Sequence, residues 1–258
     1  MKIVTINKDI NASPALYRGY TKDGMLLVTS IFKTIQGEGP YAGEPCVFLR
    51  LAGCNIGEKT DCEWCDTRFT FSEGKVISID DVARTIHEIM GNARLVVVTG
   101  GEPLLQWSAM FDLIRSMGRY RWQFETNGLL LKSDVIDAAK PHDITFVVSP
   151  KVPATWQVYR AVPNYWAAGN VQLKYVVDVD PTSRYHQPGP TGGLTTYLSG
   201  MAVYKRAVRR DEVSNIWDRT LIDQEATALN YRHAANLVLH GQDHYRLSLQ
   251  THLFAGVE

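Results

Sequence analysis

Short apolar runs recur along the chain, and each ends in a polar or glycine-containing motif. Continuous apolar runs of this length are typical of buried parallel strands. Segments with helical periodicity lie between several of them, and this alternation predicts βα units in a mostly parallel sheet. The runs and their motifs are Cys46–Leu51 before a cysteine-rich loop, Leu95–Val98 before Thr99-Gly100-Gly101-Glu102-Pro103, Trp122–Glu125 before Thr126-Asn127-Gly128, and Ile144–Val148 before Ser149-Pro150-Lys151.

The rest of the chain fits the same α/β pattern without a convincing linker, so we expect a single domain over residues 1–258. Residues 1–25 are interpreted as an N-terminal extension, and the Pro- and Gly-rich residues 178–193 as an inserted loop. Ser78 is expected to cap a helix with Ile79, Val82, Ile86 and Ile89 on one face. The other expected helices are Gln106–Met117, Ser133–Ala139 and Asp218–Leu239, and the other expected strands are Leu26–Phe32, Val171–Val177, Thr195–Leu198 and Tyr245–Leu249.

The cysteine-rich loop indicates a metal centre. Cys54, Cys62 and Cys65 are spaced C-x7-C-x2-C, and the polar run Glu58–Asp61 between them is typical of a loop. Thiolates hold iron–sulfur clusters or zinc. A closed zinc site needs four protein ligands, and no nearby histidine offers a fourth. We therefore favour a [4Fe–4S] cluster with one open iron over a zinc-stabilised binding module, buried apolar cysteines or a disulfide.

Composition narrows the functional classes. The chain has 258 residues, of which 45% are hydrophobic and 21% charged, as in an ordinary globular protein. Lys+Arg and Asp+Glu total 27 each, so no net field attracts nucleic acid or anionic membrane. Four cysteines, three of them clustered, favour a reducing cytoplasm over a disulfide framework. Cys46 begins an apolar run and is interpreted as a buried strand residue, and the basic run Lys205–Arg210 as a solvated helix face rather than an RNA site.

The motif Thr99–Pro103 follows a buried strand, and such strand ends carry the sites of α/β proteins. Gly100 and Gly101 let a ligand approach the backbone closely, and Glu102 adds an acceptor for a cationic amine. A plain turn in which Pro103 opens a helix is the alternative.

Together, the three-cysteine loop and the Gly-Gly-Glu-Pro motif resemble the radical S-adenosylmethionine (SAM) superfamily. Further segments resemble its 7-carboxy-7-deazaguanine synthase family over about residues 28–178, and again near Thr195–Met201 and residues 220–258. These segments are Ile35-Gln36-Gly37-Glu38-Gly39-Pro40, Phe48–Cys54, Cys65-Asp66-Thr67, Glu125-Thr126-Asn127-Gly128, Ser149-Pro150-Lys151 and the weaker Gln250-Thr251-His252.

The resemblance implies a partial βα barrel of the radical SAM type. It implies a [4Fe–4S] cluster whose open iron binds SAM. One electron then cleaves SAM to methionine and a 5′-deoxyadenosyl radical, and SAM is regenerated when the substrate hydrogen is returned. The implied reaction converts 6-carboxy-5,6,7,8-tetrahydropterin into 7-carboxy-7-deazaguanine with loss of ammonia, in queuosine-type biosynthesis. Mg²⁺, an electron donor such as a flavodoxin or ferredoxin, and a homodimer are also expected. A glycyl-radical activase is the nearest alternative, and Gln36–Gly39 and Glu125–Gly128 argue against it.

Roles carry over residue by residue as what the resemblance implies. Glu125, Arg50 and His252 would be catalytic, Thr67 would bind Mg²⁺, and Cys54, Cys62 and Cys65 would hold the cluster. The residues implied to bind SAM are Trp64, Cys65, Asp66, Gly101, Glu102, Ser149, Pro150, Lys151, Ser199, Gly200 and Met201. Those implied to contact substrate are Ile35, Gln36, Gly37, Glu38, Arg50, Thr99, Glu125, His252 and Glu258.

The chemistry of individual residues is consistent with these roles. The planar fork of Arg50 suits a substrate carboxylate, although a structural ion pair would also use it. Glu125 can bind pterin N–H groups or move protons, and helix capping is its alternative. Two features depart from the family pattern: the x7 spacing after Cys54, where x3 is the commonest in the superfamily, and Gly200, where the family more often has proline.

Overall fold

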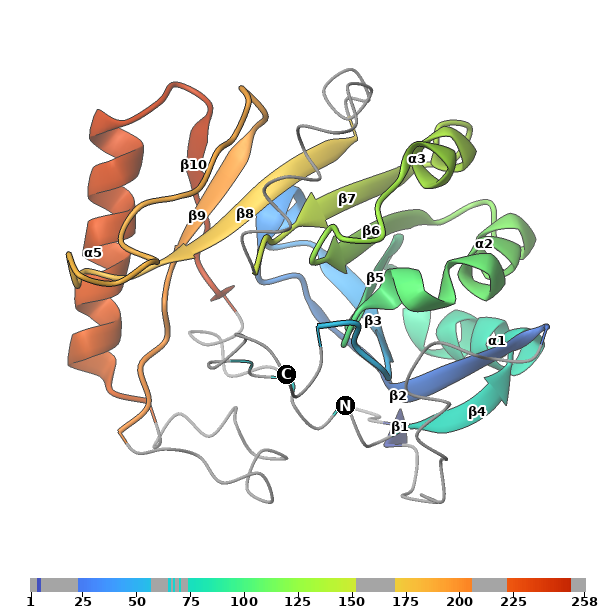
Figure 1. Ribbon diagram of the computed structural model, residues 1–258. Coiled ribbons are helices and arrows are strands. Elements are labelled where there is room, and N and C mark those ends of the chain that lie inside the picture. The colour runs from blue at the N-terminus through green and yellow to red at the C-terminus, as the bar shows by residue number, and fades with distance from the viewer. Residues whose placement is uncertain are drawn as a thin grey trace.

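The computed structural model describes residues 4–5, 23–56, 65, 67, 70, 74–151, 170–205 and 222–251. Their strands form one 10-stranded sheet, which curves through the molecule with helices along its outer side (Figure 1). The strands are β1 Val4–Thr5, β2 Met25–Ile35, β3 Pro45–Leu51, β4 Lys75–Ser78, β5 Leu95–Gly100, β6 Arg121–Thr126, β7 Ile144–Val148, β8 Val171–Val177, β9 Thr196–Gly200 and β10 Tyr245–Leu247. The helices are α1 Ile79–Met90, α2 Trp107–Ser116, α3 Ser133–Ala139 and α5 Gln224–His240, with short 3₁₀ turns η2 Gly39–Tyr41 and η4 Pro103–Gln106.

The sheet is mostly parallel, as predicted. Its order is β1-β2-β3-β5-β6-β7-β8-β9-β10, with β4 also paired to β2. Pairing is parallel from β3 to β10, whereas β2 is antiparallel to β1, β3 and β4. The described strands therefore form a curved, open sheet of the partial-barrel kind, and the ends of the parallel strands meet along one edge.

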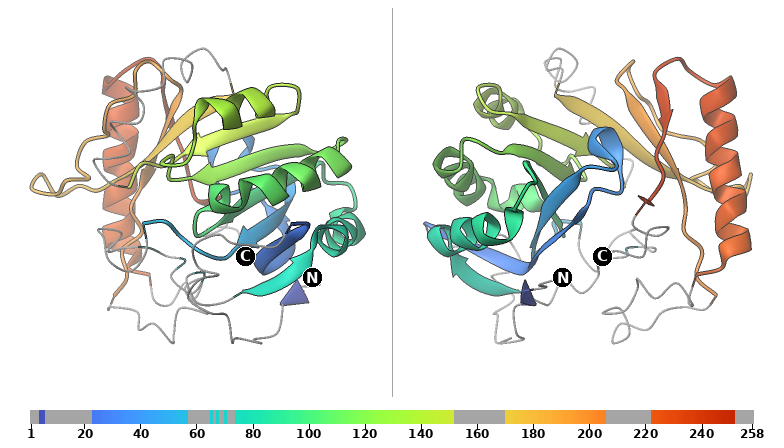
Figure 2. Two further views of the ribbon diagram at one scale, coloured as in Figure 1. Left: turned by 45° about the vertical axis from the view of Figure 1, so that its right-hand side comes forward. Right: turned by 180° about the vertical axis from the view of Figure 1, so that it is seen from behind.

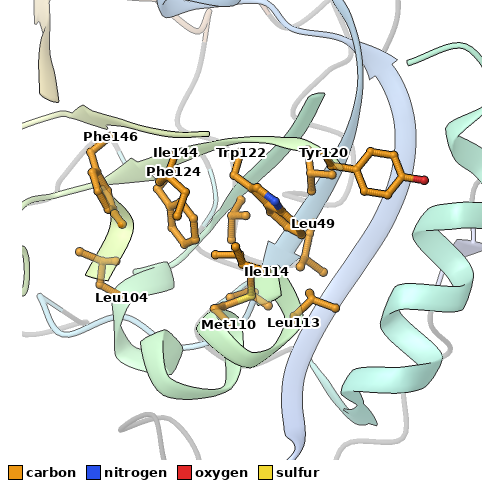
Figure 3. Close-up of a cluster of buried hydrophobic side chains, with 14 of the residues drawn as sticks. Leu49, Leu104, Met110, Leu113, Ile114, Tyr120, Trp122, Phe124, Ile144 and Phe146 are labelled. Carbon is orange, nitrogen blue, oxygen red and sulfur yellow. The ribbon is translucent and has the colours of Figure 1, made fainter. Parts of the chain in front are cut away.

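The outer face of the sheet carries the main hydrophobic core. Trp122, Phe124 and Phe146 are fully buried there. Figure 3 shows Trp122 above Met110 and Leu113 of α2, and Phe146 above Leu104 of η4. The rings of Phe124 and Phe146 lie 5.6 Å apart between centroids. Burying one side chain of this size contributes about 1.5–3 kcal/mol, so this layer fixes the strands whose tips carry the polar motifs.

Several predicted elements are confirmed to the residue, namely α3, β7 and β8. The predicted cap of α1 is also confirmed, because the Ser78 hydroxyl accepts a hydrogen bond from the Asp81 amide at 3.1 Å. Ile79, Val82 and Ile86 form the buried face of that helix.

Other predicted boundaries were wrong. The long helix begins at Gln224 rather than Asp218, because Ile222 bridges to Tyr204 and Asp223 caps the helix through the Ala226 amide. The last strand ends at Leu247 rather than Leu249: the Ser248 amide still donates to the Leu198 carbonyl of β9, but the Gln250 amide donates to the Tyr231 hydroxyl of α5 instead. β4 was missed because it has four residues with no apolar alternation, and β1 shows that part of the N-terminal extension joins the sheet.

The loop between β2 and β3 folds into the concave side of the sheet. Gln36, Glu38 and Gly39 are buried there, and the Tyr41 hydroxyl lies 2.8 Å from the Thr145 hydroxyl on β7. Figure 2 shows the loop, in blue, curled beside β8 when the molecule is seen from behind. Its polar and glycine residues are typical of a solvated turn, but the loop forms a buried wall of the concave face.

The Pro- and Gly-rich residues 178–193 connect β8 to β9 without helix or strand, as expected of a loop. They pack on α5, where the His233 ring nitrogen lies 2.7 Å from the His186 carbonyl oxygen and Val179 donates its amide to Asn230. No helix in the described part of the chain is long and apolar enough to cross a membrane.

Candidate active site

The tip of β5 is joined directly to the start of the cysteine loop. Gly101 donates its amide to the Leu51 carbonyl at 3.1 Å, and Glu102 donates to the Gly53 carbonyl at 2.7 Å. A Cβ at position 101 would collide with the Gly53 carbonyl oxygen, and one at 100 with that of Leu51. The two glycines are therefore required by this close backbone contact, in addition to any ligand they expose.

Two of the three loop cysteines lie at this same tip. Cys54 follows Gly53, and its Cβ is 3.2 Å from the position that a Cβ on Gly101 would take. The Cys65 sulfur is 3.7 Å from the Thr67 hydroxyl, which donates to the Gly100 carbonyl at 3.3 Å. Neither cysteine is disulfide-bonded.

The donor set at the β5 tip fits a cluster held by thiolates beside bare glycine backbone. Cys62, Trp64 and Asp66 lie outside the described residues. Within the described residues, no three His, Cys, Asp or Glu side chains gather as a metal site by themselves. Cys54 and Cys65 are thus two members of the predicted ligand set.

Glu102 links the tips of β5 and β6. Its buried carboxylate accepts hydrogen bonds from the Thr126 hydroxyl at 2.7 Å, the Asn127 amide at 2.8 Å and the Leu104 amide at 3.0 Å. Burial raises the pKa of Glu102 to about 7, and these three donors act in the opposite direction. Asn127 extends the link through its side-chain amide, which donates to Asn55 of the cysteine loop at 2.7 Å.

This burial makes stability depend on pH. The pKa of Glu102 rises from 4.5 to about 7, so its protonated form stabilises the fold below pH 4.5, and that contribution is lost as the pH rises through about 7. We expect Glu102→Gln to remove this slope, worth about 3 kcal/mol at 1.36 kcal/mol per pH unit. Urea unfolding under anaerobic conditions from pH 4.5 to 8 measures this slope. Glu88→Gln, at an exposed position of α1, is the matched control. Parallel curves for Glu102→Gln and the unsubstituted protein would contradict the assignment.

A second carboxylate, the half-buried Glu125, lies one residue before the end of β6 on the concave face. One of its oxygens accepts from the Gln36 amide at 3.1 Å and from Gln123 at 3.3 Å, and the other accepts from the Thr99 hydroxyl at 2.9 Å. Burial and then the charge of Glu38 raise the pKa of Glu125, whereas Lys174 and the donors Gln36 and Thr99 lower it. The helix-capping alternative does not describe this carboxylate, whose partners are the side chains of Gln36, Gln123 and Thr99 on the concave face.

Arg50, near the end of β3, lies beside Thr99, which donates to Glu125, whereas Ile35 is exposed. Arg50 is 5% exposed, is in register with Thr99, and stacks its guanidinium 5.1 Å above the Phe32 ring. The side chain of Ile35 is 37% exposed at the end of β2. Any contact of Ile35 with substrate would therefore need its backbone or a movement of the strand end.

The tips of β7 and β9 complete the same edge of the sheet. Ser149 donates its amide to the Thr126 carbonyl at 2.8 Å and leads into buried Pro150 and then Lys151. At β9, a Cβ on Gly200 would lie 2.5 Å from the Tyr231 amide nitrogen of α5. Glycine stands here because α5 packs against the strand end. Ser199 approaches the Tyr231 hydroxyl at 3.4 Å, and Met201 accepts from Asn230 through its carbonyl at 2.9 Å.

The segment after β10 contacts the buried loop between β2 and β3. Thr251 donates its amide to the Gly37 carbonyl at 3.2 Å and its hydroxyl to the Gln36 carbonyl at 3.3 Å. His252 and Glu258 lie outside the described residues. Thr251, the neighbour of His252, therefore contacts the loop whose Gln36 side chain donates to Glu125.

Two residues near Glu125 were not predicted: Lys174 of β8 and Gln123 of β6. Lys174 pairs with Glu38, and Gln123 is fully buried beside Glu125. A signal was present: Gln172 and Lys174 alternate with apolar residues in Val171–Val177, so that strand has one polar face.

Comparison with known proteins places this geometry in a family. Residues 50–153 match the model of the radical SAM superfamily. A 7-carboxy-7-deazaguanine synthase of Rickettsia prowazekii is 31% identical over 243 residues, which cover 92% of this chain and 91% of the relative. One from Koribacter versatilis is 29% identical over 238 residues, which cover 88% and 95%. The crystal structure of QueE from Escherichia coli matches the fold with a TM-score of 0.52 at 19% identity, over 93% of this chain and 98% of that one. The chain belongs to the 7-carboxy-7-deazaguanine synthase family of radical SAM proteins.

Proposed function

We propose that this chain converts 6-carboxy-5,6,7,8-tetrahydropterin into 7-carboxy-7-deazaguanine with loss of ammonia, as a radical SAM lyase of 7-deazapurine biosynthesis. The observation that carries the proposal is the convergence of two features on one edge of the sheet. The cysteine loop meets the Gly101–Glu102 tip of β5, and the neighbouring β6 tip presents the half-buried acceptor Glu125. A cofactor at the first and a substrate at the second would be neighbours.

We assign Cys54, Cys62 and Cys65 as ligands of a [4Fe–4S] cluster. Cys54 and Cys65 already lie at the β5 tip, and the spacing puts Cys62 in the same loop. When bound, the cluster and SAM supply the 5′-deoxyadenosyl radical that abstracts a substrate hydrogen. Membership of the radical SAM superfamily implies both groups.

The strand tips around this loop would hold SAM. The assigned residues are Trp64, Cys65, Asp66, Gly101, Glu102, Ser149, Pro150, Lys151, Ser199, Gly200 and Met201. Glu102 would act through position, because three donors already occupy its carboxylate. Gly101 presents backbone beside Cys54 without a side chain, and Lys151 brings a positive charge near a SAM carboxylate.

The concave pocket would bind the pterin. Glu125 would accept from pterin N–H groups, and Arg50 would pair with the substrate carboxylate. Gln36, Gly37, Glu38, Thr99, His252 and Glu258 would form the remaining wall, with Ile35 at its edge. These residues would place the reacting hydrogen beside the radical carbon and exclude water from the pocket.

We further assign Thr67 as a Mg²⁺ ligand, because a hydroxyl oxygen suits this hard cation alongside substrate oxygens. The proposal includes a low-potential electron donor such as a flavodoxin or ferredoxin and a homodimeric assembly. A cytoplasmic location would keep the loop thiols reduced.

Anaerobic turnover tests the function. Reconstituted protein, reductant, SAM, Mg²⁺ and 6-carboxytetrahydropterin should give a new deazapurine chromophore, with SAM not consumed in proportion. Iron and sulfide analysis on the same sample separates this function from a zinc-stabilised module. Cleavage of SAM without a deazapurine product would contradict the substrate assignment and favour another radical SAM activity.

A further inference from the structure

A continuous polar chain leads from β8 to the pocket carboxylate. Lys174 forms an ion pair with Glu38, and their side chains are 13% and 10% exposed. The backbone amide of Glu38 donates to the side-chain oxygen of Gln36 at 3.2 Å. The side-chain nitrogen of Gln36 then donates to Glu125 at 3.1 Å, and Thr99 donates to the other Glu125 oxygen at 2.9 Å.

The direction of these hydrogen bonds shows that Glu125 acts as a hydrogen-bond acceptor. A backbone N–H can only donate, so the Glu38 amide fixes the oxygen of the Gln36 side chain toward itself. The Gln36 nitrogen must then face Glu125 as a donor. Donors on both oxygens of Glu125 match the ionised carboxylate, which is an acceptor only.

The charge balance of this cluster depends on Lys174. Two carboxylates, Glu38 and Glu125, lie close enough for the charge of one to raise the pKa of the other, and burial raises it most. Lys174 is a cation that acts in the opposite direction. Removing it would leave the charges of buried Glu38 and half-buried Glu125 near each other, and such carboxylate pairs take up a proton.

Other titratable or charged groups also surround this cluster. Arg50 and Cys46 approach from β3, and burial followed by the charge of Glu125 raises the pKa of the Cys46 thiol. Tyr231 approaches from α5, and burial chiefly, with a smaller part from Glu38, raises the pKa of its hydroxyl. The thiol and the phenol therefore stay neutral near pH 7, and neither replaces the ammonium of Lys174.

We propose that Lys174 is a positioning residue of the active site: by holding Glu38 it fixes the orientation of Gln36 and keeps Glu125 an acceptor for substrate N–H groups. This inference rests on the proposed function, which puts the pterin on Glu125. It adds a residue on β8, remote in sequence from the family's motifs, to the set that determines substrate binding.

The test uses the reconstituted holoenzyme and the acidic limb of the kcat/KM profile, which reports the free enzyme. Lys174→Met should move that limb to higher pH by about one unit or more, because an opposite charge at close range shifts a carboxyl pKa by about 1–3 units. Glu38→Gln should move it to lower pH, which keeps the test decisive if Lys174→Met folds poorly. In the double variant the acidic limb should return to within about half a pH unit of that of the unsubstituted enzyme. Lys174→Arg, which keeps the positive charge, should have the same limb as the unsubstituted enzyme.

A second measurement needs no substrate. The melting temperature of the Lys174→Met holoprotein should fall more steeply with rising pH than that of the unsubstituted protein, because a carboxyl pKa raised by folding gives stability that is lost as pH rises. The double variant should restore the original slope. Unchanged slopes, or an acidic limb that stays in place despite changed slopes, would overturn the role of Lys174. Absence of turnover by the unsubstituted enzyme would instead overturn the proposed function.

Discussion

Gly101→Ala is expected to abolish assembly of the iron–sulfur centre while leaving most of the sheet folded. The added Cβ would collide with the Gly53 carbonyl oxygen and crowd the Cβ of Cys54 at 3.2 Å. The cysteine loop would have to move away from β5, breaking the hydrogen bonds that Gly101 and Glu102 make to Leu51 and Gly53. Overpacking of this kind costs about 1–3 kcal/mol, and a shift of about 1 Å in a reactive group can lower turnover about 100-fold.

Iron and sulfide content, the visible absorbance of the reconstituted protein and its anaerobic turnover measure this outcome together. Gly118→Ala is the matched control, because the atom nearest to its Cβ would be the Arg115 carbonyl oxygen at 4.0 Å. That variant should keep full iron content and turnover. A Gly101→Ala protein with full iron content and normal turnover would show that the contact between β5 and the loop does not position the centre.

The sequence predicted the sheet well because its strands have clear patterns. β7 is buried at every position, as expected of a parallel strand covered on both faces, whereas β8 alternates buried apolar residues with partly exposed ones. Both were located to the residue. The polar motifs after these runs then had to meet at one edge, because parallel strands end on the same side. Short β4, with two exposed residues, offered no such pattern.

The partners of the site residues were not predictable in the same way. Lys174 and Glu38 are 136 positions apart, and their contact depends on the β2–β3 loop folding into the concave face rather than projecting into solvent. A loop composed of Gln36, Glu38 and glycines resembles a solvated turn in sequence. Burial of these polar groups is possible because β6 and β8 supply partners for them.

The same limit explains Glu102 and Gly200. The sequence presents Glu102 as an open acceptor at a strand end, but the neighbouring β6 tip supplies the Thr126 and Asn127 donors that engage it. Position 200 is glycine where the resemblance predicted proline. A Cβ there would collide with α5, which packs closely against the strand end but follows it later in the sequence. Both features follow from which elements become neighbours in the folded sheet.

Replacing the loop cysteines one at a time is expected to have the largest effect of all. Cys54→Ala, Cys62→Ala and Cys65→Ala each leave two thiolates, too few to hold the cube and keep one iron open for SAM, so each should abolish turnover. Cys46 provides the internal control. It is fully buried in β3 beside Leu95 and Val97, and burial raises the pKa of its thiol, so it stays protonated and does not act as a thiolate ligand.

Cys46→Ala should therefore keep its iron, sulfide and turnover while losing about 1 kcal/mol of stability, a typical cost for a buried substitution. Iron and sulfide analysis, the broad visible absorbance and deazapurine formation separate the two classes of variant in one preparation. Turnover that survives any of the three loop substitutions would overturn the ligand assignment, and loss of the cluster in Cys46→Ala would transfer that assignment to β3. Cys54 and Cys65 both reach the β5 tip, whereas Cys46 lies near the other end of β3, in register with the first residue of β5. The geometry therefore allows the cluster to be held by the loop cysteines or by Cys46, and not by both.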